Sequence, residues 1–291
     1  MSLPSGRWGA WSSALRLRES AAAQDAAAAL EEAGCSALWM TGGLGDPFPR
    51  VTELLAATSR IVVATGILSI WTMPADEVAT AVRALPDPDR FLLGLGVSHA
   101  QLVDHADPGR YRRPLSRMRA YLDELDAAGG PDAGDRVLAA LGPRMLDLAA
   151  TRAAGAHPYL TTPEHTSLAR TALGPAAYLA PTQMVVLEAD PELARSAARR
   201  HLAMYLGQPN YRSSWERLGF TEEDAAHGGS DRLIDALVAW GEPERVAERL
   251  HEHVAAGADH VCLQVLDRQA GWKDQALPVA DWQRLLAALA A

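Results

Sequence analysis

Cysteine and aromatic residues are both scarce in this chain. Only two cysteines, Cys35 and Cys262, occur among its 291 residues, and they lie far apart in the sequence. Two distant cysteines provide neither a disulfide framework nor the spacing of a structural zinc site, and this usage fits a reducing cytosol. Aromatic residues make up 6% of the chain, so we expect a core built mainly of alanine, leucine and valine.

Long apolar runs and excess positive charge are lacking as well. No window approaches the ~18 uninterrupted apolar residues of a membrane span, and the first residues, MSLPSGRWGAW, lack the basic and apolar regions of a signal peptide. The formal net charge is −9, and the one basic cluster, Gly109–Arg119, is local. We therefore expect a cytoplasmic protein that binds neither membranes nor nucleic acid.

Short apolar runs alternate with longer helical patterns along the whole chain. The predicted strands are Gly6–Trp11, Ser36–Met40, Arg60–Ile67, Arg90–Val97, Arg136–Leu141, Ala156–Leu160, Gln183–Leu187 and Asp259–Leu266. The predicted helices are Glu19–Ala33, Pro49–Thr58, Ala75–Ala84, Arg113–Ala127, Pro143–Ala153, Pro163–Ala172, Pro191–Tyr205 and Pro243–Ala256. Strands that alternate with helices pair in parallel. Eight such units in under 300 residues favour a closed (β/α)₈ TIM barrel over an open sheet.

An Ala-Gly joint between helix and strand occurs three times and supports the barrel. Its glycines, Gly34, Gly155 and Gly257, are predicted to be left-handed helix caps, where a side chain would cost energy. The stretch after the seventh predicted strand is too long for one helix and a turn. We interpret Gln208–Ser230 as an insertion on the barrel rim and residues 1–291 as a single domain.

The start of the fifth predicted helix is the first candidate site, because the active site of such a barrel lies at the C-terminal ends of its strands. The apolar run stops at Gly142-Pro143, and Arg144 lies in the first helical turn. Glycine permits close backbone approach, and the N–H groups of Arg144, Met145 and Leu146 would face an anion. A glycine-capped helix with a solvated arginine explains the spacing equally well.

GLGVSH, at the end of the fourth predicted strand, resembles half of a dinucleotide fingerprint. The third glycine is missing, and HAQLVDHADPGR is a poor helix start, so the Rossmann interpretation fails. In a barrel the two glycines would leave space above the strand and place His99 at the rim of the cavity. A single histidine is more often structural than catalytic, although its ordinary pKa of about 6.5 suits proton transfer.

Other catalytic signals are weak or missing. The sequence has no Gly-x-Ser-x-Gly elbow and no phosphate loop. His251 and His253 lie two apart on a predicted helix and face different directions, so we expect no metal site. Gln264, near the C-terminal end of the last predicted strand, faces the barrel interior, where core packing is the simpler role and contact with a ligand is the alternative.

Taken together, these motifs resemble the luciferase-like monooxygenase superfamily, and within it the oxidoreductases that depend on the 5-deazaflavin coenzyme F420. The similarity covers roughly Gly6 to Leu266. It is carried by VVATGILSIW, RFLLGLGVSHAQLV, YRRPLSRMRAYLDELD, VLAALGPRMLDLAATRAAGAHPYLTTPEHT, GGSDRLIDALVAWG and AGADHVCLQVL. Each motif is modest alone, but their order and spacing together are specific.

The resemblance implies a homodimeric TIM barrel that holds the deazaflavin ring over the strand ends. A non-prolyl cis peptide, here Gly66–Ile67, would lie behind the ring, with Ser69 and Ser98 in contact with the cofactor. The cofactor phosphate would bind along Gly142, Pro143, Arg144 and Met145, and Ala140 and Leu141 would also contact the cofactor. His99 matches the position of an acidic proton donor in some relatives. It therefore becomes the leading catalytic candidate, as the group that gives or takes a proton during hydride transfer.

The small organic substrate would lie on the open face of the ring under Trp11, Met40 and Trp71. A solvated helix face with its lead-in loop is the simpler role for the arginines of Gly109–Arg119, and the alternative is that Arg110, Arg112 and Arg113 meet an acidic cofactor tail. An alternative is a monooxygenase that uses flavin mononucleotide (FMN), for which a terminal-phosphate site suffices. Close relatives carry an acidic residue after the second strand, and TGGLGDPFP (Thr41–Pro49) has none near Gly42, so a barrel that only binds or supports other molecules is a third interpretation.

Overall fold

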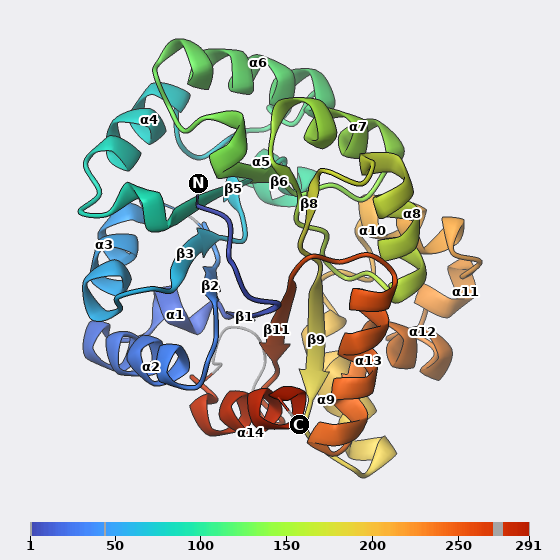
Figure 1. Cartoon of the computed structure of the whole chain (residues 1–291). Helices are drawn as coiled ribbons and strands as arrows, with labels where there is room; N and C mark the ends of the chain where they lie inside the picture. Colours follow the sequence, from blue (N-terminus) through green and yellow to red (C-terminus); the bar gives the residue numbers. More distant parts are fainter. Residues whose placement is uncertain (1, 44, 270–275, 291) are drawn as a thin grey trace.

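The computed structural model describes residues 2–43, 45–269 and 276–290. The strands are β1 (Trp8–Trp11), β2 (Ala37–Met40), β3 (Val62–Thr65), β4 (Leu68–Ser69), β5 (Phe91–Gly96), β6 (Arg136–Leu138), β7 (Gly155–Ala156), β8 (Tyr178–Leu179), β9 (Thr182–Val186), β10 (Val238–Trp240) and β11 (Val261–Val265). Helices surround them on all sides (Figure 1).

The α-helices follow the strands in the order that the sequence predicts, with several additions. They are α1 (Ala14–Leu17), α2 (Ser20–Glu32), α3 (Phe48–Ala57), α4 (Ala75–Arg83), α5 (Ala100–Ala106), α6 (Pro114–Ala127), α7 (Pro143–Arg152), α8 (Pro163–Leu173), α9 (Pro191–Leu202), α10 (Pro209–Arg217), α11 (Glu222–Ala225), α12 (Asp231–Leu237), α13 (Pro243–Ala255) and α14 (Val279–Ala290). Two 3-10 turns, Pro88–Arg90 and Ala133–Asp135, precede β5 and β6.

The strands close into a parallel barrel, which confirms the predicted (β/α)₈ fold. The first strand, β1, pairs with β2 on one side and with β11 on the other. Strands β3 and β4 are two halves of the third barrel strand, and β8 and β9 are two halves of the seventh. A parallel bridge between Tyr159 and Thr182 joins the sixth strand to the seventh and completes the circle.

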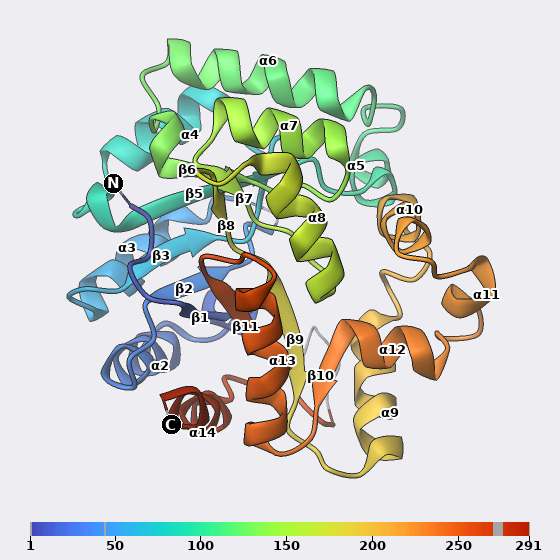
Figure 2. The same ribbon diagram turned by 45° about the vertical axis from the view of Figure 1, so that its right-hand side comes forward.

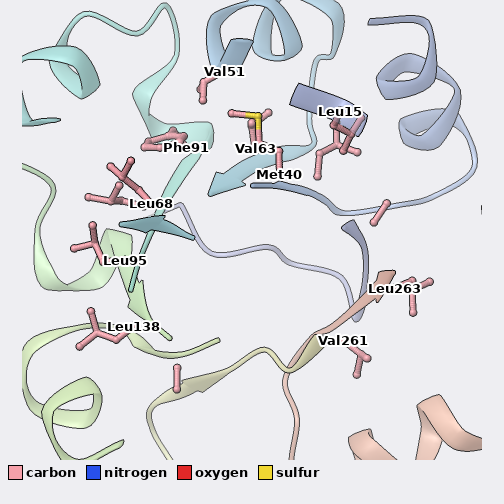
Figure 3. Packing of buried hydrophobic residues seen from close by; sticks show 14 of the residues in the cluster. Leu15, Met40, Val51, Val63, Leu68, Phe91, Leu95, Leu138, Val261 and Leu263 are labelled. Atoms are coloured by element: carbon pink, nitrogen blue, oxygen red, sulfur yellow. The ribbon is translucent and has the colours of Figure 1, made fainter. Parts of the chain in front are cut away.

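Side chains alternate between the barrel interior and the layer beneath the helices. Trp39 and Cys262 belong to an interior cluster, whereas Leu38, Met40 and Val63 belong to the larger cluster between strands and helices. Figure 3 shows Met40 and Val63 in this outer layer. Alternation with a period of two explains why neighbours in one strand enter different clusters.

The three predicted glycine caps have two different roles. Gly34 and Gly257 adopt positive φ angles of +88° and +102°, as expected of left-handed caps. Gly155 does not, because it lies within β7, where an added Cβ would come within 1.8 Å of the Tyr178 carbonyl oxygen. The prediction of a helix cap at Gly155 was therefore wrong, because this glycine instead allows β7 and β8 to approach each other closely.

Several elements depart from the sequence prediction. The segment after His99, judged a poor helix start, forms α5, and the seventh strand begins at Tyr178 rather than at Gln183. The strand β10 and the helix α14 have no counterpart among the predicted elements. A strand of three residues, such as β10, is too short to show an alternating pattern, because one such run cannot be distinguished from a helix end.

The predicted rim insertion contains α10 and α11 and ends at Ser230, whose side chain caps α12. Figure 2 shows these helices projecting from one side of the barrel, with α10 nearest to α5 and α8. Gln208 donates to the Oε1 atom of Gln101 on α5 at 3.0 Å, so the insertion contacts the loop that follows β5. In the part of the chain that the structure describes, no helix is long and apolar enough to cross a membrane.

Candidate active site

The third barrel strand is interrupted at its C-terminal end, between β3 and β4. The Gly66–Ile67 peptide bond is cis, as the family resemblance implied. Trp11 donates from Nε1 to the Gly66 carbonyl oxygen at 3.0 Å, and the Gly66 amide donates to Met40 at 2.7 Å. Both Gly66 and Ile67 remain partly exposed at the barrel mouth, so this interruption forms part of an accessible floor.

The two glycines of β5 accommodate this interruption. A Cβ on Gly94 would lie 1.9 Å from the Thr65 carbonyl oxygen, and one on Gly96 would lie 2.4 Å from Ile67 Cδ1. From the sequence, these glycines were predicted to leave empty space above the fourth strand. That expectation was wrong, because the Thr65 backbone and the Ile67 side chain fill it.

Ser69 and Ser98 follow the third and fourth strands. The Ser69 hydroxyl is buried and accepts a hydrogen bond from the Trp71 amide at 3.3 Å, so it stabilises a turn. Ser98 is half-buried and has a φ of 56°, a sparsely populated conformation that is often found at functional sites. Tyr111 donates to its carbonyl oxygen at 3.4 Å. A ligand at the mouth would therefore meet Ser98 before Ser69.

The start of α7 is an accessible, positively polarised corner. Gly142 is the N-cap, Pro143 is the first helical residue, and the nearest atom to an added Gly142 Cβ would be Arg217 Nη2 at 3.7 Å. The exposed Arg144 side chain forms no ion pair or hydrogen bond with the described residues. Helix N-terminal amides and nearby guanidinium groups together suit a phosphate. By contrast, Ala140 is buried, so only its backbone could face a ligand.

Arg217 is the functional candidate that the sequence analysis missed at this corner. It belongs to α10 in the rim insertion, and its Nη2 atom donates to the Leu141 carbonyl oxygen at 3.4 Å. The buried His165 donates to the same oxygen from Nε2 at 3.0 Å. No sequence motif connects positions 141 and 217, because only the folded insertion brings them together.

His99 stands at the rim, as predicted, and is the N-cap residue of α5. Its ring packs against those of Tyr211 and Tyr205, with centroid separations of 5.5 and 6.4 Å. The buried Nδ1 atom has no hydrogen-bond partner among the described residues. Burial lowers the pKa of His99 below its ordinary value, and the side chain of Asn210 partly opposes this shift. The imidazole is therefore neutral at pH 7.

The three predicted substrate-pocket residues lie in different parts of the structure. Trp11 lies in the barrel mouth, where it contacts Gly66 and, at 5.8 Å between ring centroids, Tyr159. Trp71 is held by a 2.8 Å hydrogen bond from Nε1 to the Val97 carbonyl oxygen. Met40 is fully buried in the outer layer, so it cannot line a pocket. That prediction was wrong because side-chain alternation in β2 turns Met40 away from the mouth.

A cavity of about 620 Å³ lies beside the site rather than in the mouth. Trp71 forms one wall, and the opposite side includes Arg110 and Arg117. Arg117 is already engaged by Glu124 at 2.7 Å. The walls of the cavity come mainly from α6 and from residues 70–76, which lead from β4 into α4, so the cavity lies between these outer elements and the end of the third barrel strand.

Beneath the mouth, the barrel floor holds buried histidines. His157 stacks on Trp39 at 4.2 Å, and the Nε1 atom of Trp39 donates to His260 at 3.2 Å. Burial lowers the pKa of both histidines to about 4, so both are neutral at physiological pH. No cluster of histidine, cysteine or carboxylate side chains within residues 2–43, 45–269 and 276–290 could hold a metal ion.

With this geometry in view, comparison with known proteins identifies the family. The luciferase-like monooxygenase family model matches residues 7–260, so the chain belongs to that family. No curated protein matches the sequence significantly.

Solved structures share the fold at low sequence identity. The F420-dependent tetrahydromethanopterin reductase of Methanopyrus kandleri has a TM-score of 0.72, 17% identity and 97% coverage of each chain. An F420-dependent secondary alcohol dehydrogenase has a TM-score of 0.68, 14% identity, and coverage of 97% of this chain and 98% of its own. The oxygenating constituent of 3,6-diketocamphane monooxygenase from Pseudomonas putida, solved with FMN, has a TM-score of 0.66, 13% identity, and coverage of 97% and 96%.

Proposed function

We propose that the protein is an oxidoreductase that binds coenzyme F420 at the barrel mouth and transfers a hydride between this deazaflavin and a small organic substrate. Membership of the luciferase-like family supports a flavin-type cofactor. The observation that carries the proposal is the open corner at Gly142, where helix amides and two arginines, Arg144 and Arg217, favour a phosphate.

The residues at the mouth suit the remaining tasks of such an enzyme. The bound cofactor would supply a ring carbon that accepts or donates a hydride. The partly exposed Gly66 and Ile67 would support one face of the ring, while the corner before α7 fixes its phosphate. His99 would hold the accompanying proton, because its neutral imidazole has an unpartnered nitrogen at the rim.

FMN is the second candidate cofactor, because its binding would require only a site for one terminal phosphate, which the corner at Gly142 provides. Arg110, Arg112 and Arg113 favour the deazaflavin instead. All three are exposed in the segment between α5 and α6, where they would attract an acidic tail. Either cofactor would therefore use the arginines of the phosphate corner, whereas only the deazaflavin would use the three arginines between α5 and α6.

Fluorescence titration of both cofactors tests the proposal. We expect Arg144→Ala and Arg217→Ala each to weaken binding of either cofactor roughly tenfold, because each removes a charge-assisted contact with phosphate. Removing Arg110, Arg112 and Arg113 together should weaken only the deazaflavin. Arg249→Ala on α13, whose arginine pairs with Glu252, is the charge-matched control. A wild-type protein that binds neither cofactor would instead support the non-catalytic interpretation.

His99→Ala tests the proton role once turnover is measurable. We expect kcat to fall by about 10² to 10⁴, the usual contribution of general acid–base catalysis. Cofactor affinity should stay unchanged, since the residue is not assigned to the phosphate corner. Unchanged turnover together with normal cofactor binding would remove His99 from the mechanism.

A further inference from the structure

Besides His99 Nδ1, two further buried polar atoms at the barrel mouth lack hydrogen-bond partners among the described residues: the Tyr159 hydroxyl and Gln264 Oε1. Tyr159 follows β7, and Gln264 lies in β11, two residues beyond the interior-facing Cys262. Burial raises the pKa of Tyr159, and the side chain of Gln264 lies close enough to the Tyr159 hydroxyl to oppose this rise in part. Buried polar atoms without partners are uncommon in folded proteins, and each calls for an explanation.

Aromatic rings connect this pair to His99. Tyr159 contacts Tyr205 with centroids 5.5 Å apart and Tyr211 with centroids 6.3 Å apart. Tyr205 and Tyr211 contact each other at 5.5 Å, and both contact His99. We call Tyr159, Tyr205 and Tyr211 the tyrosine cluster. Since Tyr211 comes from α10, the rim insertion supplies one wall of a site whose other polar groups come from barrel strands.

The tyrosine cluster is electrically neutral. Burial raises the pKa of all three phenols, so each is protonated and able to donate at pH 7. Among the described residues, the ionisable groups that act on these phenols by charge or hydrogen bond all belong to the cluster, and none of them is a carboxylate or a guanidinium. A charged ligand group here would be desolvated without a partner, whereas a neutral polar group would not.

We propose that Tyr159, with Gln264, determines specificity by binding the oxygen of a neutral carbonyl or alcohol substrate, an inference that rests on the proposed oxidoreductase function. A carbonyl oxygen can only accept hydrogen bonds, and the Tyr159 hydroxyl can donate one to it. An alcohol can also donate, and Gln264 Oε1 can accept. Tyr159 and Gln264 can therefore form hydrogen bonds with both the carbonyl form and the alcohol form of one substrate. The rings of Tyr205 and Tyr211 contact its apolar part.

Calorimetric titration with three six-membered-ring probes tests this assignment. Protein saturated with its cofactor is titrated with cyclohexanone, cyclohexanol and cyclohexanecarboxylate. We expect the two neutral probes to bind and the carboxylate to bind at least tenfold more weakly. Tyr159→Phe should weaken cyclohexanone binding about tenfold, which corresponds to about 1.4 kcal/mol. Gln264→Leu should weaken cyclohexanol binding more than cyclohexanone binding.

Tyr178→Phe is the matched control. Tyr178 is also buried with a hydroxyl that lacks a partner, but it lies in the interior cluster below the mouth. Both phenylalanine variants should keep the wild-type melting temperature or exceed it, because neither hydroxyl is paired in the free protein. Only Tyr159→Phe should affect probe binding, and it should leave cofactor affinity intact.

The remaining outcomes separate this inference from the proposed function. Normal cofactor binding with equal cyclohexanone affinity in wild type and Tyr159→Phe would overturn the role of Tyr159 alone. Tighter binding of cyclohexanecarboxylate than of cyclohexanone would overturn the neutral substrate class. Failure of the wild-type protein to bind either cofactor would overturn the proposed function, and this inference with it.

Discussion

Two glycines at the barrel mouth, Gly94 and Gly142, look alike in the sequence but serve different purposes. Gly94 faces the Thr65 carbonyl oxygen, which belongs to the backbone and cannot rotate away. Gly142 has an ordinary extended conformation, with a φ of −101°, and an added Cβ would meet only the flexible end of Arg217 at 3.7 Å. The first glycine is required by packing, and the second keeps a corner open.

This contrast yields a prediction for alanine substitutions. Gly94→Ala should lower the free energy of unfolding by about 3 kcal/mol, at the upper end of overpacking costs, because β3 and β5 must separate. Gly142→Ala should change it by less than about 0.5 kcal/mol. Urea unfolding of both variants measures the difference. Equal stability of the two proteins would mean that β5 moves freely and that the close approach to Thr65 is unimportant.

At the residue scale, the sequence predicted the site residues that follow a strand directly. His99 and Gly142 could be placed at the mouth because strand ends in this fold meet at one face. Arg217 and Tyr211 could not be placed, because they come from an insertion whose path depends on tertiary contacts. Met40 was misplaced because the sequence does not state which face of β2 points inward.

At the scale of elements, α10 is the most informative helix. Trp215 donates from Nε1 to the carbonyl oxygen of Leu160 at 3.0 Å, and Leu160 has a positive φ of 56° at the end of the sixth barrel strand. Further along the helix, Arg217 reaches Leu141. The insertion is thus attached to two strand ends, and Tyr211 lies about one helical turn before the first attachment, at Trp215.

Loss of one attachment should loosen the insertion without unfolding the barrel. Trp215→Phe leaves the Leu160 carbonyl oxygen unpaired, at a cost of about 1–3 kcal/mol. We expect faster amide exchange within residues 205–230 and little change elsewhere. Trp282→Phe is the matched control, because that indole donates to the Leu263 carbonyl oxygen at the same 3.0 Å distance but lies on α14. Equal exchange in both variants would contradict an anchoring role for Trp215.

Element boundaries were harder to predict than element order. The order of strands and helices followed from alternation and from glycine and proline positions. The break between β3 and β4, the short β10 and the early start of the seventh strand at Tyr178 depend on pairing with neighbours that lie far away in the chain. Local patterns carry no information about such pairing.

At the scale of the whole molecule, buried histidines link stability to pH. His157 and His260 inside the barrel have pKa values of about 4, and His253 on α13 has one of about 3. Desolvation is the main cause in each case. His253 is neutral and hydrogen-bonded to Gln183 at 2.9 Å and to Thr166 at 2.8 Å. In the unfolded chain each histidine would take up a proton near pH 6.5.

The folded protein should therefore lose stability as pH falls from about 6.5 towards 5. Below the unfolded pKa, the unfolded state binds more protons than the folded state, so each histidine contributes a loss of about 1 kcal/mol per pH unit. Urea midpoints measured at pH 7, 6 and 5 provide the test. In His253→Gln, which preserves a polar side chain, the loss should shrink by about a third. A midpoint that is constant over this range would contradict the buried neutral state.

The pairing of β1 with β11 has a consequence for how the chain acquires its shape during synthesis. Residues near position 9 stay without their second neighbour until residues near position 262 have been made. Until then the nascent polypeptide exposes the open edge of a partly formed barrel to other chains. The barrel can therefore close only after β11 has been synthesised, and α14 then packs against α2.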